Sequence, residues 1–180
     1  MSETRRVKNL LLTGRPGVGK TTVVQAVARL FPGEVGGFLT GEIRERGMRK
    51  GFSITSVEGA NVVMAHVDFR SSVRVGKYGV DLPAFERIAL AALRDAIQRK
   101  RIIVIDEIGK MELASQKFCE AVREALSSGK FVVATIMQHR HPFADEIRAL
   151  PSAEVIEVTT QNRDVLPGRI REMIAMEALR

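Results

Sequence analysis

The stretch LLLTGRPGVGKTTVVQAV, residues 10–27, contains three different patterns in direct succession. Its first residues form an apolar run that is typical of a buried strand. Glycines then recur at positions 14, 17 and 19, where they favour a tight turn. From Lys20 onward, the apolar residues follow helical spacing. The stretch therefore predicts a strand, a glycine-rich loop and a helix, and this unit is the starting point for the fold class.

The loop and the start of the helix fit the pattern G-x-x-x-x-G-K-[ST], which is typical of phosphate binding. Glycines allow backbone N–H groups to approach a phosphate, and the positive end of the following helix attracts the same anion. Lys20 is expected to neutralise β- and γ-phosphate charge, Thr21 to bind Mg²⁺, and Thr22 to reach the α-phosphate. The predicted nucleotide-binding residues of this segment are Gly14, Arg15, Pro16, Gly17, Val18, Gly19, Lys20, Thr21 and Thr22.

The remaining sequence alternates between strand-like and helical segments. Strands are expected at residues 7–14, 102–106, 130–137 and 153–158, and helices at 20–31, 82–100, 115–126, 142–151 and 169–180. Ser115 is the expected N-cap of its helix, whereas Pro167 and Gly168 are expected to delay or kink the last one. This alternation predicts an α/β fold with a mostly parallel central sheet that has helices on both faces.

Residues 37–67 depart from the alternation, because three short β-rich segments follow one another. Residues 46–50 and 58–60 separate the segments and have the length of hairpin connections. We therefore expect an antiparallel β-meander inserted within a single domain that spans residues 1–180.

A second motif lies in RIIVIDEIGKMEL, residues 101–113, where a buried strand ends in two acids. In a parallel sheet, ligands bind at the carboxyl ends of the strands, so this end is expected near the phosphate loop. Asp106 is the predicted Mg²⁺ partner, acting through a metal-bound water, and Glu107 is predicted to orient water for attack on the γ-phosphate. Lys110 could contact phosphate, balance the two acids or pair with Glu112.

The pair Asp106–Glu107 favours hydrolysis over phosphoryl transfer, and the hydrolytic arrangement generally has another strand between the two motif strands. A nucleotide or small-molecule kinase is the alternative enzyme. A nucleotide-gated module that binds nucleic acid is a third possibility, because the net charge is +7. The basic residues are scattered and the chain has one Tyr and no Trp, so nucleic acid is not favoured as a partner.

Arginines are candidates for stabilising transition-state charge on the transferred phosphoryl group. Arg44 and Arg163 are the leading predictions, and with Lys20 and Glu107 they complete the predicted catalytic set. The group Asn162–Arg163–Asp164 could instead frame the base or cap the last helix.

Composition limits the class of protein further. The chain has 180 residues, of which 45% are hydrophobic and 27% charged, as in ordinary globular domains. No apolar run is long enough to cross a membrane, and the N-terminus lacks the features of a signal peptide. The single Cys119 cannot form an internal disulfide. We expect a cytoplasmic protein with no membrane partner; the sequence leaves the oligomeric state open and is compatible with a monomer.

Five motifs in this order carry a family resemblance: GRPGVGKTT (14–22), GGFLTGEIRERGMRKGFSI (36–54), VGKYGVD (75–81), VIDEIGKMEL (104–113) and NRD (162–164). The chain closely resembles the thermostable nucleoside-triphosphatase family, which includes the human cancer-related nucleoside triphosphatase. The resemblance implies a RecA-like fold and Mg²⁺-dependent hydrolysis of several nucleoside triphosphates, ATP and GTP among them, to diphosphate and phosphate. LPGRI, residues 166–170, departs from the uninterrupted helix expected there.

Overall fold

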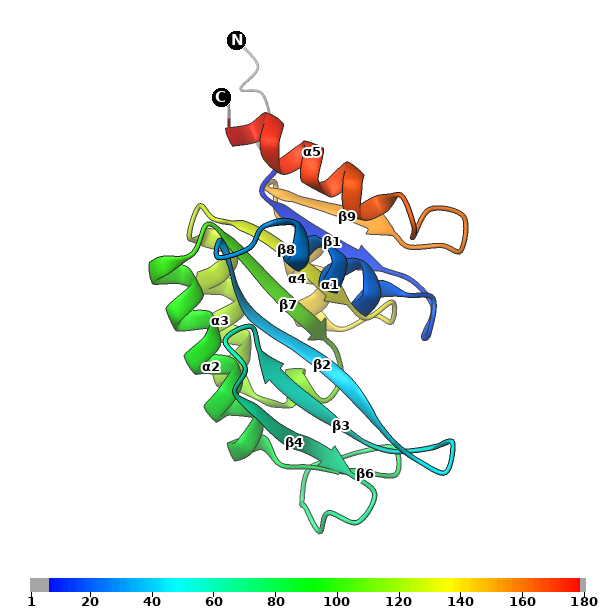
Figure 1. Ribbon diagram of the computed structural model, residues 1–180. Helices are drawn as coiled ribbons and strands as arrows, with labels where there is room; N and C mark the ends of the chain where they lie inside the picture. Colours follow the sequence, from blue (N-terminus) through cyan, green and yellow to red (C-terminus); the bar gives the residue numbers. More distant parts are fainter. Residues whose placement is uncertain (1–6, 179–180) are drawn as a thin grey trace.

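The computed structural model describes residues 7–178, and its elements alternate as the sequence predicts (Figure 1). The strands are β1 (Asn9–Thr13), β2 (Val35–Glu45), β3 (Met48–Ser56), β4 (Asn61–His66), β5 (Arg74–Val75), β6 (Tyr78–Val80), β7 (Ile102–Ile108), β8 (Phe131–Ile136) and β9 (Ala153–Glu157). The helices are α1 (Lys20–Leu30), α2 (Leu82–Arg99), a 3₁₀ turn η1 (Glu112–Ala114), α3 (Gln116–Ser127), α4 (Pro142–Arg148) and α5 (Leu166–Ala178).

All of these strands belong to one sheet with the order β5-β6-β4-β3-β2-β7-β8-β1-β9. The strands from β2 to β9 in this order pair in parallel, which confirms the predicted α/β fold with a mostly parallel sheet. Strand β8 lies between β1, which leads into the phosphate loop, and β7, which carries the acidic pair. The intervening strand predicted for a hydrolytic enzyme is therefore present.

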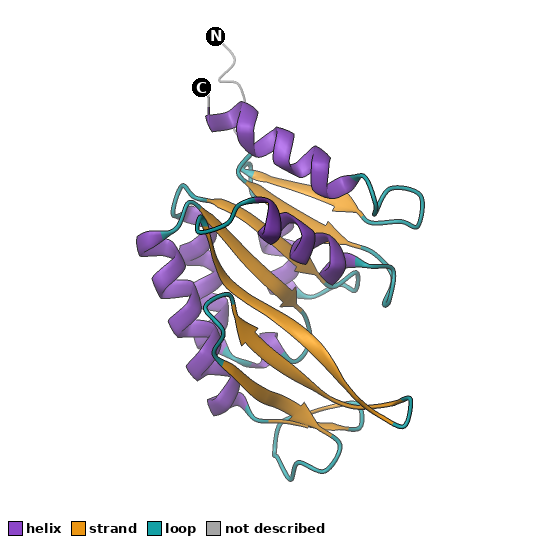
Figure 2. Cartoon of the chain, in the orientation of Figure 1, coloured by secondary structure: helices purple, strands orange, loops and turns teal. Residues whose placement is uncertain are grey.

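Helices cover both faces of the sheet (Figure 2). Helices α1 and α5 pack on one face, and α2, α3 and α4 on the other. Along the buried strands, successive side chains enter opposite cores: Leu10 and Leu12 face α1, and Leu11 faces α2 and α3. A strand buried on both faces needs apolar residues at every position, which is why these strands appear in the sequence as continuous apolar runs.

The predicted meander is present and continues the same sheet. Strand β2 pairs in parallel with β7 over Val35–Phe38, then antiparallel with β3 over Phe38–Glu45. The first hairpin turn is shorter than the predicted separator 46–50, because only Arg46 and Gly47 lie outside the strands. Both have positive φ, 49° and 79°, as a two-residue hairpin turn requires. The small β5–β6 hairpin was not predicted, since strands of two and three residues leave no periodic signal.

The start of α3 agrees with the prediction from the sequence, whereas the start of α5 does not. The Ser115 hydroxyl accepts a hydrogen bond from the Phe118 N–H at 3.1 Å, which confirms Ser115 as the N-cap. The expected delay or kink at Pro167 and Gly168 is wrong, because α5 begins at Leu166 and includes both residues. Pro167 lies in the first helical turn, where its missing N–H removes no intrahelical hydrogen bond.

Two further expectations concern Cys119 and the membrane. Cys119 is 5% exposed on the buried face of α3, where it packs as an apolar side chain. No helix among residues 7–178 combines the length and the hydropathy needed to span a membrane.

Candidate active site

The phosphate loop, residues 14–19, connects the end of β1 to the first turn of α1. Gly14, Gly17 and Gly19 have φ values of 145°, 77° and 112°, which side chains rarely tolerate. A Cβ at Gly14 would lie 2.7 Å from the Val158 carbonyl oxygen, so this glycine also permits close packing on the end of β9. Gly19 is the N-cap of α1 and supplies no side-chain acceptor, which leaves the first N–H groups of the helix available to an anion.

Lys20 lies folded over the loop that precedes it. Its ammonium donates to the Gly14 carbonyl at 3.0 Å and to the Arg15 carbonyl at 3.4 Å. The positive charge is therefore held at the concave side of the phosphate loop, and its field favours the charged form of Glu107. This is the position at which a lysine can bind the phosphates of a nucleotide.

Asp106 connects the phosphate loop to the central strands. Its Oδ1 accepts hydrogen bonds from Thr21 Oγ1 at 3.1 Å and Thr135 Oγ1 at 2.7 Å, and its Oδ2 from Thr40 Oγ1 at 3.3 Å. The carboxyl is 1% exposed, and burial raises its pKa although the threonine hydrogen bonds oppose the shift. Thr21, Thr40 and Thr135 belong to α1, β2 and β8, so four elements converge on this one carboxyl group.

The donor set around Asp106 fits Mg²⁺, because a hydroxyl oxygen and a carboxylate oxygen lie side by side next to the phosphate loop. Mg²⁺ is usually bound by one or two carboxylates, with water and substrate phosphates completing its shell. The described residues contain no group of three or more His, Cys, Asp or Glu side chains arranged to hold a metal by themselves. The one hydroxyl and one carboxylate beside the phosphate loop match a metal that binds together with a phosphorylated substrate.

Glu107 follows Asp106 on β7 and is partly exposed. Burial raises the pKa of its carboxyl, the positive charge of Lys20 lowers it, and the nearby Asp106 raises it further. Among the hydrogen bonds described within residues 7–178, none involves the Glu107 side chain. Its carboxyl group can therefore accept a hydrogen bond from water.

Glu112 is a third carboxyl group that sequence reasoning did not place in the site. It is 6% exposed, and burial, followed by the charge of Glu107, raises its pKa to about 8. A Cβ at Gly109 would lie 3.0 Å from Glu112 Oε2 and 3.3 Å from Glu107 Oε1, so both carboxyl groups flank the same glycine. The available signal was Gly109 itself, since its missing side chain makes room for the two acids.

Lys110 lies on the exposed side of the same segment. Among the described residues, no ion pair joins Lys110 to Glu112, because the Glu112 side chain is turned into the protein. Lys110 is close to the acids in the sequence, but no ion pair between its ammonium group and these carboxyl groups is found among residues 7–178.

The two predicted arginines lie in different surroundings. Arg44 is near the tip of the β2–β3 hairpin, where its guanidinium donates to Glu42 Oε2 at 2.8 Å and to the Gly47 carbonyl at 3.1 Å. Arg163 lies beside the phosphate loop, and its Nη1 donates to the Val18 carbonyl at 3.2 Å. The structure thus joins Arg163 to the phosphate loop, while the contacts described for Arg44 remain within its own hairpin.

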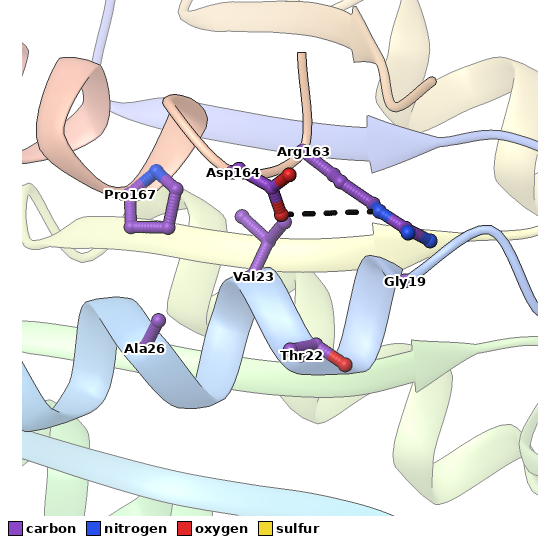
Figure 3. A pocket seen from close by; sticks show the side chains of 7 residues that line it. All are labelled: Gly19, Thr22, Val23, Ala26, Arg163, Asp164 and Pro167. Atoms are coloured by element: carbon purple, nitrogen blue, oxygen red, sulfur yellow. Dashed lines mark ion pairs between the residues drawn. The ribbon is translucent and has the colours of Figure 1, made fainter. Parts of the chain in front are cut away.

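A pocket of about 360 Å³ opens beside the phosphate loop, between α1 and the segment that leads from β9 to α5 (Figure 3). It is lined by Gly19, Thr22, Val23, Ala26, Arg163, Asp164 and Pro167. Asn162 shapes this segment: its Oδ1 accepts from the Thr159 N–H and its Nδ2 donates to the Glu157 carbonyl, both at 2.8 Å. The Asn162 side chain thus binds its own loop and does not cap α5.

Comparison with known proteins agrees with this geometry. A family model described as NTPase matches residues 9–171. A nucleoside-triphosphatase THEP1 from Thermotoga sp. (strain RQ2) is 44% identical, over 92% of this chain and 94% of the relative.

Two solved structures share the fold. The crystal structure of THEP1 from Aquifex aeolicus has a TM-score of 0.84 and 40% identity, and the match covers 92% of this chain and 98% of the other. The solution structure of a human cancer-related nucleoside triphosphatase has a TM-score of 0.79 and 38% identity, with 95% and 97% covered. The chain therefore belongs to the NTPase family, as its motifs predicted.

Proposed function

We propose that this protein hydrolyses nucleoside triphosphates, including ATP and GTP, to nucleoside diphosphate and phosphate with the help of Mg²⁺. The observation that carries the proposal is the 3.1 Å hydrogen bond from Thr21 to Asp106, because it joins the phosphate loop to the acidic end of β7. A phosphate held by the loop would thereby lie between the Lys20 ammonium and the partly exposed carboxylate of Glu107, which water can reach.

The positions of Lys20, Thr21 and Asp106 support the roles predicted for them in binding phosphate and Mg²⁺. The loop N–H groups and Lys20 bind the β- and γ-phosphates and balance the charge that develops on them. Thr21 and Asp106 would hold Mg²⁺, which supplies further positive charge to the phosphates when it is bound.

Glu107 is proposed to orient the attacking water. The water oxygen forms a bond to the γ-phosphorus as the bond between this phosphorus and the β,γ-bridging oxygen breaks. The bridging oxygen leaves with the nucleoside diphosphate, and the proton of the attacking water passes toward the Glu107 carboxylate. Burial raises the pKa of the Glu107 carboxyl and so makes it a stronger base than an exposed glutamate, while the positive charge of Lys20 opposes this shift and favours the charged form.

The test is release of phosphate from Mg-ATP and Mg-GTP by the wild type and Glu107→Gln. We expect a fall in kcat of about a hundredfold or more, with little change in nucleotide affinity, because glutamine keeps the shape but cannot accept the proton. The control Glu124→Gln changes an exposed acid on α3 and should be neutral. A Glu107→Gln enzyme as fast as the wild type would show that Glu107 does not have this role.

The same assay separates the alternatives. A phosphorylated acceptor, found when candidate acceptors are added, would identify a kinase in place of a hydrolase. Stimulation by DNA or RNA at low salt would identify a nucleic-acid-dependent enzyme. Arg44 and Arg163 stay predictions for transition-state charge, to be identified by a loss of kcat without loss of nucleotide affinity.

A further inference from the structure

We infer that Glu112 is a positioning residue for Glu107: across Gly109, its buried carboxyl group donates a hydrogen bond that keeps the Glu107 carboxylate directed at the attacking water. This inference rests on the proposed function, since it concerns the group that orients the water. It assigns a role to a buried acid that the proposed reaction does not otherwise use.

Gly109 lies between the two acids and leaves room for both. A Cβ placed on this glycine would lie 3.0 Å from Glu112 Oε2 and 3.3 Å from Glu107 Oε1. These two oxygens are therefore separated by no more than the sum of the two distances, about 6 Å, a span that one water molecule can bridge. The hydrogen bonds of a catalytic group are often long before substrate binds and shorten in the complex. The separation is thus compatible with a hydrogen bond in the loaded site.

The turn that carries Glu112 is tied to its surroundings. The Leu113 N–H donates to the Gly109 carbonyl at 2.9 Å, and the Ser115 N–H donates to the Glu112 carbonyl at 3.0 Å. The Ser115 hydroxyl also donates to the Glu86 carboxyl group of α2 at 2.7 Å. These bonds hold Glu112 inside the protein, where it is 6% exposed. A side chain held in this way can fix a neighbour that is itself free to rotate.

Glu112 is suited to be the donor of the pair and Glu107 the acceptor. Among residues 7–178, no ion pair joins Glu112 to a cation, and a buried acid without a cation favours its neutral form. Burial, and then the charge of Glu107, raises the pKa of Glu112 to about 8, although backbone hydrogen bonds from Glu112 and Gly109 oppose the shift. Glu107 is partly exposed, and the positive charge of Lys20 favours its charged form.

A positioning role has a kinetic consequence that a purely structural role lacks. A hydrogen bond to one oxygen of the Glu107 carboxylate leaves the other oxygen available to the attacking water. Correct orientation of this group speeds the chemical step and contributes little to nucleotide binding. Loss of Glu112 should therefore lower kcat and leave KM unchanged, whereas an acid that only closed its own turn would affect Tm alone.

The experiment measures phosphate release from Mg-ATP near neutral pH, together with Tm, for the wild type, Glu112→Leu and Glu112→Gln. Leucine fills the space but cannot donate, so we expect kcat to fall about tenfold with KM within about twofold of the wild type. Glutamine has a similar shape and keeps a donor, so its kcat should stay within about twofold of the wild type. The exposed Glu124→Leu on α3 is the matched control.

The same substitution in the Glu107→Gln background tests whether Glu112 acts through Glu107. We expect Glu112→Leu to lower kcat less than about twofold there, because no carboxylate remains to be held. An equal loss of kcat in both backgrounds would overturn the inference, since Glu112 would then act independently of Glu107. A Glu112→Leu enzyme with wild-type kcat and only a lower Tm would overturn it as well.

A second variant leaves both acids in place. Gly109→Ala inserts a methyl group close to both carboxyl groups, so that they must move apart. We expect kcat to fall severalfold at unchanged KM, and this loss to disappear in the Glu107→Gln background. If Glu112→Leu does not fold, Gly109→Ala decides the question, and wild-type kcat in this variant would overturn the inference.

The inference and the proposed function fail in different ways. If the wild type releases no phosphate, the proposed function is wrong and the role of Glu112 falls with it. If the wild type releases phosphate and Glu107→Gln is slow, but Glu112→Leu and Gly109→Ala are as fast as the wild type, the proposed function stands and only the role of Glu112 is wrong.

Discussion

The two sides of the phosphate loop differ in how they are built. On the side of β7, Asp106 is 1% exposed and receives hydrogen bonds from three threonines on three other elements. On the side of the β9–α5 segment, Arg163 and Asp164 have side chains that are 43% and 88% exposed, on a loop held by its own hydrogen bonds. The first side is desolvated, which strengthens electrostatic effects on a reacting phosphate. The second is open to solvent, so its charged groups stay accessible beside the phosphate loop.

The largest effect is expected on the buried side, from Asp106→Asn. The substitution keeps the shape of the side chain but removes the negative charge proposed to hold Mg²⁺, so kcat should fall about a thousandfold. Steady-state phosphate release over a range of Mg²⁺ concentrations measures this loss. The control Asp68→Asn alters an acid that is 82% exposed and should leave the rate unchanged. If Asp106→Asn kept a tenth of the wild-type rate, the acidic side would not depend on its buried charge.

A second effect on the same side is a dependence of stability on pH that comes from Glu112. Its pKa rises from an ordinary 4.5 to about 8 through burial, so its neutral form is favoured in the folded protein. The stability that this group contributes is fully present below pH 4.5 and is lost as the pH rises through 8.

Glu112→Gln should therefore have a Tm close to the wild type at pH 4.5, and a higher Tm, by about 5 °C or more, at pH 9. Thermal melts across this range test the expectation. Subtracting the wild-type curve removes the contributions of Asp106 and Glu107, which have the same sign. The control Glu124→Gln changes an exposed acid and should show no such trend. A constant difference in Tm at all pH values would mean that Glu112 is not buried in its neutral form.

The smallest effect is expected on the open side, from Asn162→Ala. Loss of the side-chain bonds to Thr159 and Glu157 loosens the loop that carries Arg163, at a stability loss of about 1 kcal/mol. We expect the KM for ATP to rise roughly threefold, since the loop that places Arg163 beside the phosphate loop is held less firmly. The neighbouring exposed Gln161→Ala is the matched control. A fall in kcat as large as that of Asp106→Asn would remove the distinction between the two sides.

Most of the fold could be predicted because each buried element has a recognisable pattern of apolar residues. The continuous apolar runs of β1, β7 and β8 and the spaced apolar residues of α1 and α2 correspond to the observed elements. The errors arose where local signals compete. Pro167 and Gly168 suggested a break, yet a proline in the first helical turn is compatible with a helix that begins at Leu166.

The candidate site was predicted unevenly for a similar reason. The residues 14–22 and the pair Asp106–Glu107 have fixed spacing, so they were identified before the structure was known. Pairing with Glu112 was one of three alternatives for Lys110, whereas the turn η1 directs Glu112 into the protein beside Glu107. A charged residue in a sequence is in most cases exposed to solvent, so a buried acid such as Glu112 is recognised only from the packing of the folded chain.

Local residue types at fixed spacing were enough to predict the strand, glycine-rich loop and helix, the acidic strand end and the family. Only the folded chain shows that Thr21, Thr40 and Thr135 share one carboxylate and that Arg163 lies against the phosphate loop. These contacts join residues 85, 66, 29 and 145 positions apart, respectively. No local pattern encodes such a contact, because it exists only when the sheet order brings the strand ends together.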